Sequence, residues 1–420
     1  MHLGLHRMQA VMHVLGDPHR KFPVLHIAGT NGKGSVAAFS ESILRHGGRR
    51  TGLYTSPHLV RIEERIQVAG RLISPPRFAS LIERIREAEA ELLEKDSIDR
   101  PLTFFEFITA CAFLHFCDRR VDIAVIEVGL GGLLDATNVV VPRACVITGI
   151  SWDHQNLLGH TLGAIAGEKA GIIKPGVPVV SGCRAGEARR VIRGKAREMG
   201  APLLELGRDF TMRVTAVRNG RPVIDLQTPG RTYRRLQVAL AGEHQARNAA
   251  LAVAATEQLE MLPANASAVR SGLVAARWPG RLDQYDAQRR TLMEGAHNPE
   301  GILLLRQFLR ERKEKEVHLV FGAVRDKDIR RMTAALFPLA QSIHLTPLRN
   351  SRSAAAEDIA AINSRFHKRI ELHPDSRSAL EAAWDRCSRK GLVVVTGSLY
   401  LVGELLPVVQ ESNRSLRIPR

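Results

Sequence analysis

The chain contains few aromatic residues and no organised set of cysteines. Only 5% of its 420 residues are Phe, Trp or Tyr, and no basic run alternates with aromatic residues, so a surface that stacks single-stranded nucleic acid is not expected. Its five cysteines form no C-x-x-C pair and no His/Cys cluster with zinc spacing. We therefore expect reduced and mostly buried thiols.

Long apolar runs and targeting signals are also missing. No apolar stretch approaches the roughly 20 residues of a membrane span, and the N-terminus has no basic start followed by an apolar core and a small-residue cleavage site. The sequence contains no internal repeat and no low-complexity tract. These absences predict a cytoplasmic protein with no membrane partner.

The composition is that of an ordinary globular protein with a strong basic excess. Apolar residues make up 45% and charged residues 25% of the chain, and 420 residues exceed what one hydrophobic core usually serves, which favours two domains. The formal charge of +17 requires anionic partners. Because the arginines are dispersed, we expect phosphorylated or carboxylated small molecules rather than nucleic acid.

One stretch, residues 26–35, has the layout of a phosphate-binding loop. An apolar strand ends in Gly29, Gly32 and Gly34, with Lys33 among them and Ser35 just before an alanine-rich helix. Glycines allow backbone N–H groups to close on an anion, and the following helix presents its positive end to that anion. Lys33 is then expected to reach the β- and γ-phosphates, and Ser35 to cap the helix or contact a metal ion.

This loop is a variant of the common nucleotide-binding pattern. Ile27 stands where G-x-x-x-x-G-K-[ST] requires its first glycine, and Gly34 separates Lys33 from Ser35. The alternative is a glycine-rich turn with an incidental lysine. We favour the phosphate-binding interpretation because strand, loop, lysine and helix occur in that order.

Polar residues follow three predicted strands of the same region. Ser56 follows one short strand, Glu127 ends a buried apolar strand, and His154 follows a third. The carboxyl ends of parallel strands meet at one edge of a sheet, beside the phosphate-binding loop, and a carboxylate there commonly holds nucleotide-bound Mg²⁺. A single histidine is more often a core residue, but three coincidences favour a metal site.

Three helices carry further features. The apolar spacing from Leu3 to Leu15 predicts a short helix near the entrance of the phosphate-binding loop. Residues 103–106 fit a capping box at the start of a second helix. Lys169 lies in the small, apolar helix predicted for residues 162–173, where a lysine is unfavourable unless it is paired or modified.

The C-terminal part repeats the alternation of strands and helices. Strands are predicted at 292–294, 317–321, 342–345 and 392–395, while residues 201–238 suggest short antiparallel strands and residues 277–281 a hinge. The fold expected is α/β: a doubly wound, mostly parallel sheet of the P-loop type followed by a smaller Rossmann-like α/β domain. We place the boundary between the two domains at residue 280, which gives an N-terminal domain of residues 1–280 and a C-terminal domain of residues 281–420.

Together these motifs resemble the folate branch of the Mur ligase family, the dihydrofolate synthase/folylpolyglutamate synthases. The resemblance runs nearly end to end, and it implies that residues 1–280 form an ATP-binding central domain and residues 281–420 a C-terminal glutamate-ligase domain. It rests on the motifs at residues 29–35, 54–58, 127–132, 135–138, 153–154, 168–172, 279–281, 295–299 and 397–398.

The resemblance implies that ATP drives formation of an amide between a folate-like carboxylate and L-glutamate through an acyl phosphate. It also implies two Mg²⁺ sites, and a Lys169 that is carboxylated by CO₂. The residues implied for ATP are Asn31, Gly32, Lys33, Gly34, Ser35, Asn248, Arg281 and Glu294. Those implied for Mg²⁺ are Ser56, Glu127, His154 and Lys169. Those implied for the other substrates are Arg65, Thr103, Phe105, Glu106, His297 and Ser398, with Lys33, Lys169, His154 and His297 in catalysis.

Two positions depart from the family pattern. Glu294 replaces the aspartate that usually precedes Gly-Ala-His-Asn-Pro, which moves the carboxylate by about one bond length. Leu133 replaces the arginine that usually follows Gly-Leu-Gly-Gly, and this removes a charge beside the phosphate-binding loop.

Two alternatives stay open at this point. A cell-wall Mur ligase acting on a UDP-sugar precursor would share the loop and the metal residues, and a regulatory NTPase would share the loop alone. The sequence also leaves open whether dihydropteroate, folate polyglutamates or both accept the glutamate. We expect a monomer with small-molecule partners only.

Overall fold

The computed structural model describes residues 4–152, 154–184, 186–259, 265–285, 290–312, 314 and 316–414. The helices among them are α1 (His6–Val14), α2 (Lys33–His46), α3 (Pro75–Glu94), α4 (Phe104–Asp118), α5 (Gln155–Leu158), α6 (Leu162–Ala170), α7 (Gly186–Glu198), α8 (His244–Glu257), α9 (Ala266–Ala275), α10 (Pro299–Glu311), α11 (Ile329–Leu336), α12 (Ala356–Ala361), α13 (Ser376–Arg386) and α14 (Leu399–Arg414).

The strands of the described residues form three sheets. They are β1 (Val24–Ala28), β2 (Thr51–Tyr54), β3 (Ile66–Val68), β4 (Arg71–Leu72), β5 (Ile123–Glu127), β6 (Ala144–Ile147), β7 (Val179–Ser181), β8 (Leu203–Glu205), β9 (Thr211–Arg218), β10 (Arg221–Gln227), β11 (Thr232–Gln237), β12 (Asp283–Tyr285), β13 (Thr291–Met293), β14 (Val317–Phe321), β15 (Ser342–Leu345), β16 (Ile370–Leu372) and β17 (Leu392–Thr396).

The largest sheet has the order β4-β3-β2-β5-β1-β6-β7-β8. The strands from β2 to β8 in this order are parallel, and β3 and β4 add antiparallel strands at one edge. β1 lies at the centre, with Ile27 paired to Glu127 on β5 and Ala28 paired to Ile147 on β6. The carboxyl ends of these central strands therefore meet beside the loop that follows β1.

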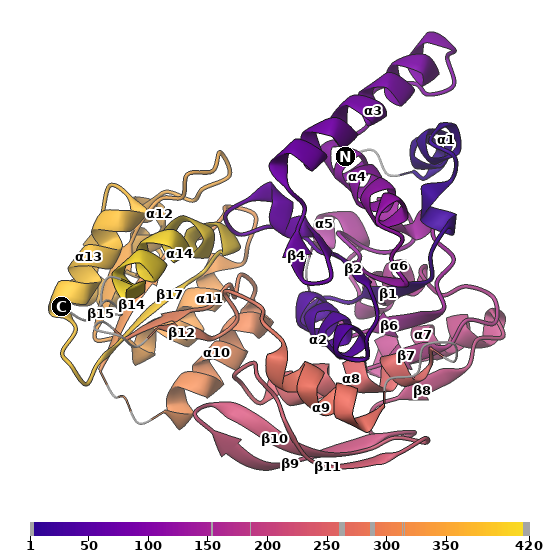
Figure 1. Ribbon diagram of the computed structural model, residues 1–420. Helices are drawn as coiled ribbons and strands as arrows, with labels where there is room; N and C mark the ends of the chain where they lie inside the picture. The colour runs from indigo at the N-terminus through magenta and orange to yellow at the C-terminus, as the bar shows by residue number, and fades with distance from the viewer. Residues whose placement is uncertain are drawn as a thin grey trace.

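The central strands β1 and β5 are buried at every position, which explains why helices cover both faces of this sheet. Leu25 and Ile27 pack with α2 and α8 on one face, whereas Val24 packs with α1, α3 and α4 on the other. The helices α6 and α7 extend that second face over β6 and β7. The antiparallel sheet β11-β10-β9 packs against α8 and α9 (Figure 1).

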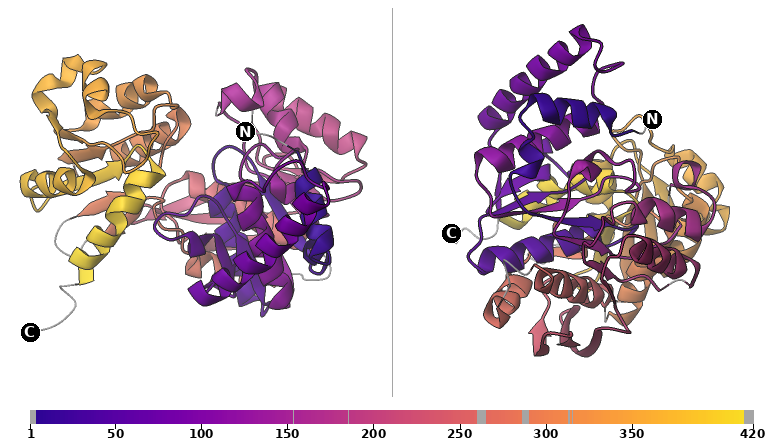
Figure 2. Two further views of the ribbon diagram at one scale, coloured as in Figure 1. Left: turned by 90° about the horizontal axis from the view of Figure 1, so that it is seen from above. Right: turned by 90° about the vertical axis from the view of Figure 1, so that its right-hand side faces the viewer.

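The third sheet has the order β12-β13-β17-β14-β15-β16, with β12 antiparallel to the parallel remainder. One face packs against α10, α11 and α12, and the other against α13 and α14. Seen from above, this part of the chain lies beside the part built on the largest sheet (Figure 2). The two α/β patterns that the sequence predicts are thus confirmed.

Some local predictions are wrong. The first helix packs against α3 and α4, and none of its residues lines the cleft that contains the phosphate-binding loop, because its apolar face joins the core on the far side of the sheet. The sequence analysis missed β3, β4, β12 and β16, which have only two or three residues each. The domain boundary at residue 280 stays a prediction.

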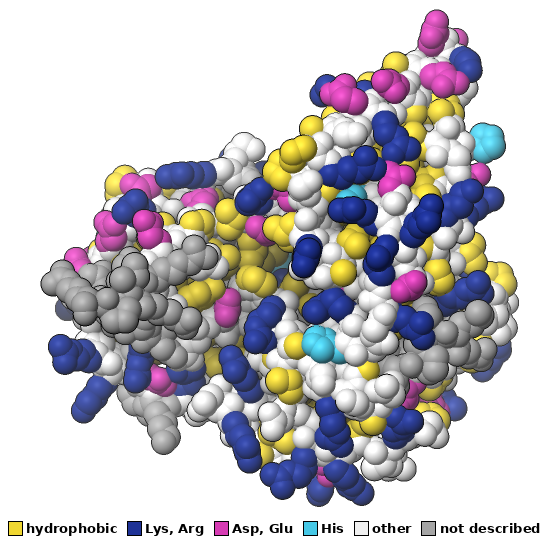
Figure 3. All heavy atoms as spheres, in the orientation of Figure 1, with side chains coloured by type: hydrophobic (Ala, Val, Ile, Leu, Met, Phe, Trp, Pro, Cys, Tyr) yellow, Lys and Arg dark blue, Asp and Glu magenta, His cyan; other side chains and the backbone are white. Residues whose placement is uncertain are grey.

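Surface charge and hydropathy agree with the composition. Lys and Arg side chains are spread over the face of the molecule drawn in Figure 3. Among the described residues, no helix combines the length and the apolar character that crossing a bilayer requires.

Candidate functional site

The loop after β1 opens into a cleft whose walls come from both α/β parts of the chain. Gly29 to Ser35, Ser56 and Glu127 line it from the largest sheet, and Arg281, Glu294 and Ser398 line it from the C-terminal sheet. The predicted phosphate-binding loop therefore lies where two sets of strand ends face each other.

The loop has the backbone form that an anion site needs. Gly32 precedes the first residue of α2 with φ of 90°, and no side chain caps this helix start, so the first N–H groups of α2 have no side-chain acceptor. The ammonium of Lys33 donates to the carbonyl oxygens of Gly29 and Thr30 at 3.1 and 3.2 Å. These bonds hold the lysine over the loop.

Two glycines of the loop are required by close neighbours. A Cβ on Gly32 would lie 2.6 Å from Oδ1 of Asn248, and a Cβ on Gly34 would lie 2.5 Å from the indole of Trp278. Asn248 is buried and donates a 2.9 Å hydrogen bond to Gln245 on the same face of α8. The start of α8 is therefore part of the cleft, as the sequence predicts for Asn248.

The predicted metal-binding residues all line the cleft: Ser56, Glu127, His154 and Lys169. The carboxylate of Glu127 is buried and accepts a 3.1 Å hydrogen bond from the backbone N–H of Ser56. Burial raises the pKa of Glu127, and the positive charge of Lys33 opposes that rise. A buried carboxylate of this kind favours a bound cation, because a cation restores its ionised form.

His154 and Lys169 approach the cleft from different helices. His154 precedes α5 with φ of 48°, a left-handed conformation that is uncommon for residues other than glycine and is found disproportionately at functional sites. Lys169 lies near the end of α6 and is buried. Asp153, the neighbour of His154 in the sequence motif, lies outside the described residues.

The Asp-Ala-Thr-Asn motif has a structural role that the sequence analysis did not resolve. Asp135 accepts hydrogen bonds from the backbone N–H of Leu130 at 2.9 Å and of Thr137 at 3.0 Å. Asn138 donates to the carbonyl oxygens of Leu133 and Gly171. These bonds fix the glycine turn after Glu127 against the end of α6, and so position the carboxylate and Lys169 relative to each other.

Glu294, which replaces the aspartate of the family pattern, lies on the C-terminal side of the cleft. Its carboxylate is buried, accepts a 2.8 Å hydrogen bond from the N–H of Leu282, and lies 3.9 Å from the guanidinium of Arg281. Burial raises the pKa of Glu294 to about 7, and Arg281 opposes the rise. The longer side chain therefore reaches the backbone beside Arg281.

His297 and Ser398 also line this side. Nδ1 of His297 lies 2.9 Å from the carbonyl oxygen of Gly295. Because a carbonyl only accepts hydrogen bonds, Nδ1 carries the proton of this hydrogen bond. Ser398 is buried and accepts a hydrogen bond from the N–H of Tyr400.

Four predicted substrate residues do not line the cleft: Arg65, Thr103, Phe105 and Glu106. Thr103 and Glu106 form the predicted capping box of α4, and Glu106 also accepts a 2.9 Å hydrogen bond from buried Arg7. The guanidinium of Arg65 lies over the exposed ring of Phe104 and donates to His58. The structural role of the capping box is thus confirmed, and its substrate role stays a prediction.

The cleft also contains residues that the sequence analysis did not single out as site residues. Arg352 donates a 2.7 Å hydrogen bond to the hydroxyl of Tyr400, and both line the cleft together with Asp326 and Lys327. Asp326 and Lys327 belong to a polar group after a predicted strand, which was a usable signal. Arg352 has no such signal, because only tertiary contacts bring it here.

Family models cover most of the chain. Residues 27–256 match the Mur ligase middle domain, and residues 280–399 match the Mur ligase glutamate ligase domain. The chain belongs to the Mur ligase family. The loop, the buried Glu127 and the opposed Arg281 all lie within these two matched regions.

The similar proteins place the chain in the folate branch of this family. Dihydrofolate synthase/folylpolyglutamate synthase of Bacillus subtilis is 36% identical over 407 residues, covering 96% of this chain and 94% of that protein. Folylpolyglutamate synthase of Lacticaseibacillus casei is 35% identical over 402 residues, covering 94% and 92%. The resemblance stated from the motifs is therefore confirmed.

Two solved structures of folate-branch enzymes are also similar to this chain. Folylpolyglutamate synthase of Mycobacterium tuberculosis, complexed with ADP, has a TM-score of 0.92 and 33% identity, covering 99% of this chain and 95% of that one. FolC of E. coli, in complex with DHPP and ADP, has a TM-score of 0.89 and 31% identity, covering 98% and 94%.

Proposed function

We propose that the chain is an ATP-dependent ligase that joins L-glutamate to a folate-type carboxylate, on dihydropteroate, on folate polyglutamates or on both. The observation that carries this proposal is the position of Lys33 and the uncapped start of α2 in a cleft opposite Arg281 and His297. The relatives' names supply the substrates, since the dihydrofolate synthase and folylpolyglutamate synthase activities both attach glutamate. A cell-wall ligase and a regulatory NTPase are not favoured.

In this proposal the loop binds the triphosphate of ATP. Backbone N–H groups from Asn31 to Ser35 and the ammonium of Lys33 contact the phosphates, with Asn248 at the adenine and Arg281 and Glu294 contacting the nucleotide from the opposite wall. Positive charge around the γ-phosphate stabilises the transition state of its transfer.

The carboxylate of Glu127 is buried and lines the cleft beside the phosphate-binding loop, a position that fits a divalent cation. We propose that Ser56, Glu127, His154 and a carboxylated Lys169 hold two Mg²⁺ ions. Mg²⁺ supplies charge neutralisation at the phosphates. Carboxylation converts the buried ammonium of Lys169 into an anion, which suits a position beside Glu127 and a metal ion.

The reaction then proceeds in two balanced steps. A carboxylate oxygen of the folate attacks the γ-phosphorus, the bond to ADP breaks, and an acyl phosphate forms. The glutamate amine attacks the acyl carbon, loses a proton, and phosphate leaves with the oxygen that came from the carboxylate. We propose that Arg65, His297 and Ser398 bind glutamate and that residues 103–106 contact the pterin. Because a closed cleft excludes water, hydrolysis of the acyl phosphate is suppressed.

We propose that the protein acts as a monomer. The test is to assay the purified protein in parallel with dihydropteroate and with tetrahydrofolate, each with ATP and L-glutamate, and to detect the products by mass spectrometry. Glutamate addition to either acceptor supports the proposal and assigns the substrate. ATP turnover with no glutamylated product from either acceptor would contradict it.

A further inference from the structure

A row of polar side chains crosses the C-terminal sheet, and none of its residues lines the cleft. His318 on β14, Ser342 and His344 on β15, Glu371 on β16 and His373 just after β16 occupy neighbouring register positions. His318 alternates with Val320, which packs in the core under α13 and α14. The row thus lies on the face of the sheet that α13 covers, and the proposed function uses none of it.

Hydrogen bonds join this row end to end. Nε2 of His318 lies 2.9 Å from Glu316, and its Nδ1 lies 2.7 Å from the hydroxyl of Ser342. The same hydroxyl lies 2.8 Å from Nε2 of His344, and Nδ1 of His344 lies 3.0 Å from Nε2 of His373. Such a continuous chain constrains which ring nitrogens carry protons.

The protons along the row can be assigned from its Glu316 end. Hydrogen bonds from Ser388 and His318 lower the pKa of Glu316 to about 2, so its carboxylate only accepts. When the ring of His318 carries a single proton, that proton lies on Nε2, which donates to Glu316. Nδ1 of His318 then accepts from Ser342, whose oxygen in turn accepts from Nε2 of His344. Nδ1 of His344 is left as an acceptor nitrogen directed at His373.

This acceptor nitrogen belongs to a compact group of possible metal ligands. Nδ1 of His344 lies 3.0 Å from Nε2 of His373 and 3.8 Å from Oε2 of Glu371, and all three atoms lie within 4.8 Å of one another. Ligands about 2.0–2.1 Å from a tetrahedral Zn²⁺ are about 3.3 Å apart. We propose that His344, Glu371 and His373 form a binding site for Zn²⁺ or a similar borderline divalent cation, with water as the fourth ligand.

The surroundings provide the support that such ligands need. Nε2–H of His344 donates to Ser342 and so fixes the tautomer and the ring, as in most metal-bound histidines. Arg386 pairs with Oε1 of Glu371 and leaves Oε2 toward His344. On metal binding, the proton on Nε2 of His373 moves to its Nδ1.

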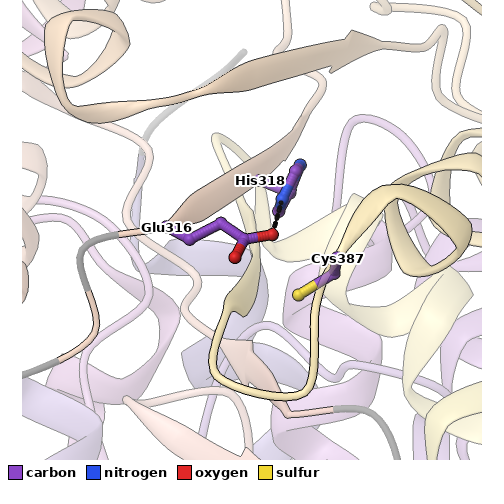
Figure 4. A group of neighbouring side chains, drawn as sticks. All are labelled: Glu316, His318 and Cys387. Atoms are coloured by element: carbon purple, nitrogen blue, oxygen red, sulfur yellow. Dashed lines mark hydrogen bonds and ion pairs between the residues drawn. The ribbon is translucent and has the colours of Figure 1, made fainter.

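The opposite end of the row offers a competing group, Glu316, His318 and Cys387 (Figure 4). In Figure 4 a dashed line marks the hydrogen bond between His318 and Glu316, and no dashed line joins the thiol of Cys387 to either residue. Both carboxylate oxygens already accept hydrogen bonds from Ser388, and burial raises the pKa of the Cys387 thiol to about 11. A cation would have to displace these donors, so we favour the His344 end.

A cation at this site would join β16, the edge strand of the sheet, to β15. The ligands Glu371 and His373 are partly exposed and His344 is buried, which gives the ion an entry path from the surface. The expected consequence is a higher thermal midpoint in the presence of the metal.

The test is a competition titration of the purified full-length protein with Zn²⁺ against a chromogenic chelator, followed by Co²⁺ absorption spectra. We expect one ion per chain at this site. His373→Ala should weaken its binding by more than about 100-fold, because loss of an outer-shell partner alone costs roughly 10- to 100-fold. Glu371→Gln should act in the same direction while preserving shape.

Matched variants separate the possible outcomes. His367→Ala, in an exposed histidine of the same region, should leave the binding unchanged. Cys387→Ser should do the same, and the Co²⁺ spectrum should contain no thiolate charge-transfer band. Binding that survives both His373→Ala and Glu371→Gln, or that Cys387→Ser abolishes, would overturn the proposal. So would the absence of any ion bound in competition with the chelator.

Discussion

The side-chain amide of Asn298 donates a 3.0 Å hydrogen bond to the side-chain oxygen of Asn31. This bond joins the start of α10 to the phosphate-binding loop, and Asn31 also donates to Glu300 on the same helix. Two segments nearly 270 residues apart in the sequence therefore meet where the phosphates of ATP are proposed to bind. The two walls of the cleft already touch at this point.

Lys33→Ala should reduce glutamate ligation by about 100- to 1000-fold with the fold intact, the usual cost of losing one preorganised charge at a transition state. The lysine donates to the carbonyl oxygens of Gly29 and Thr30, and its charge also favours the ionised form of buried Glu127. Initial rates measure the loss of ligation, and thermal midpoints test whether the fold stays intact. Lys21→Ala, an exposed lysine, is the control, and activity of the Lys33 variant within a few-fold of wild type would remove the loop from the mechanism.

Arg281→Ala should raise the KM for ATP by at least about tenfold and change the KM for folate little, because a hydrogen bond to a charged group contributes roughly 1.5–3 kcal/mol. Arg281 lines the cleft and lies 3.9 Å from Glu294. Arg277→Ala is a matched control, since Arg277 donates to the carbonyls of Val274 and Ala276. A collapse of folate affinity with unchanged ATP affinity would show that Arg281 has another role.

Glu294 should make stability fall as pH rises. Its pKa is raised from 4.5 to about 7 in the folded chain, so the folded state binds the proton more tightly than the unfolded state does. The stabilisation is full below pH 4.5 and is lost as pH passes about 7, a change of about 3 kcal/mol. Thermal midpoints of wild type and Glu294→Gln across this window should diverge with pH, and parallel curves would contradict the assignment.

Lys169 should be carboxylated in the active enzyme. It is buried and lines the same cleft as Glu127, where a carbamate favours a metal ion and an ammonium opposes one. Lys169→Ala should be inactive and partly rescued by a small carboxylic acid that fits the vacated space. A crystal structure grown with bicarbonate should contain the carbamate, and a bare lysine in fully active protein would refute this prediction.

The sequence predicted the parts of the fold that depend on local pattern. Buried apolar strands such as β14, and the loop from Gly29 to Ser35, have strong signals within a few residues. β16 has no such signal, because three half-exposed residues become a strand only when β15 pairs with them.

The residues of the candidate site also fall into two groups: those that a local sequence pattern predicts, and those that only tertiary contacts bring to the cleft. Ser56 and Glu127 were predicted from their positions at strand ends, which parallel topology brings together. Arg352 reaches the cleft through tertiary contacts alone. The capping box of residues 103–106 was predicted correctly as local structure, but spacing could not show that its residues do not line the cleft.

The most direct test of the proposed acyl-phosphate mechanism follows an oxygen atom from the folate carboxylate into the released phosphate. The substrate is labelled with a heavy oxygen isotope in the reacting carboxyl group, and released phosphate is analysed by mass spectrometry after ligation with ATP and L-glutamate. Transfer through an acyl phosphate predicts one labelled oxygen in each phosphate formed. Amide product accompanied by unlabelled phosphate would contradict the proposed mechanism.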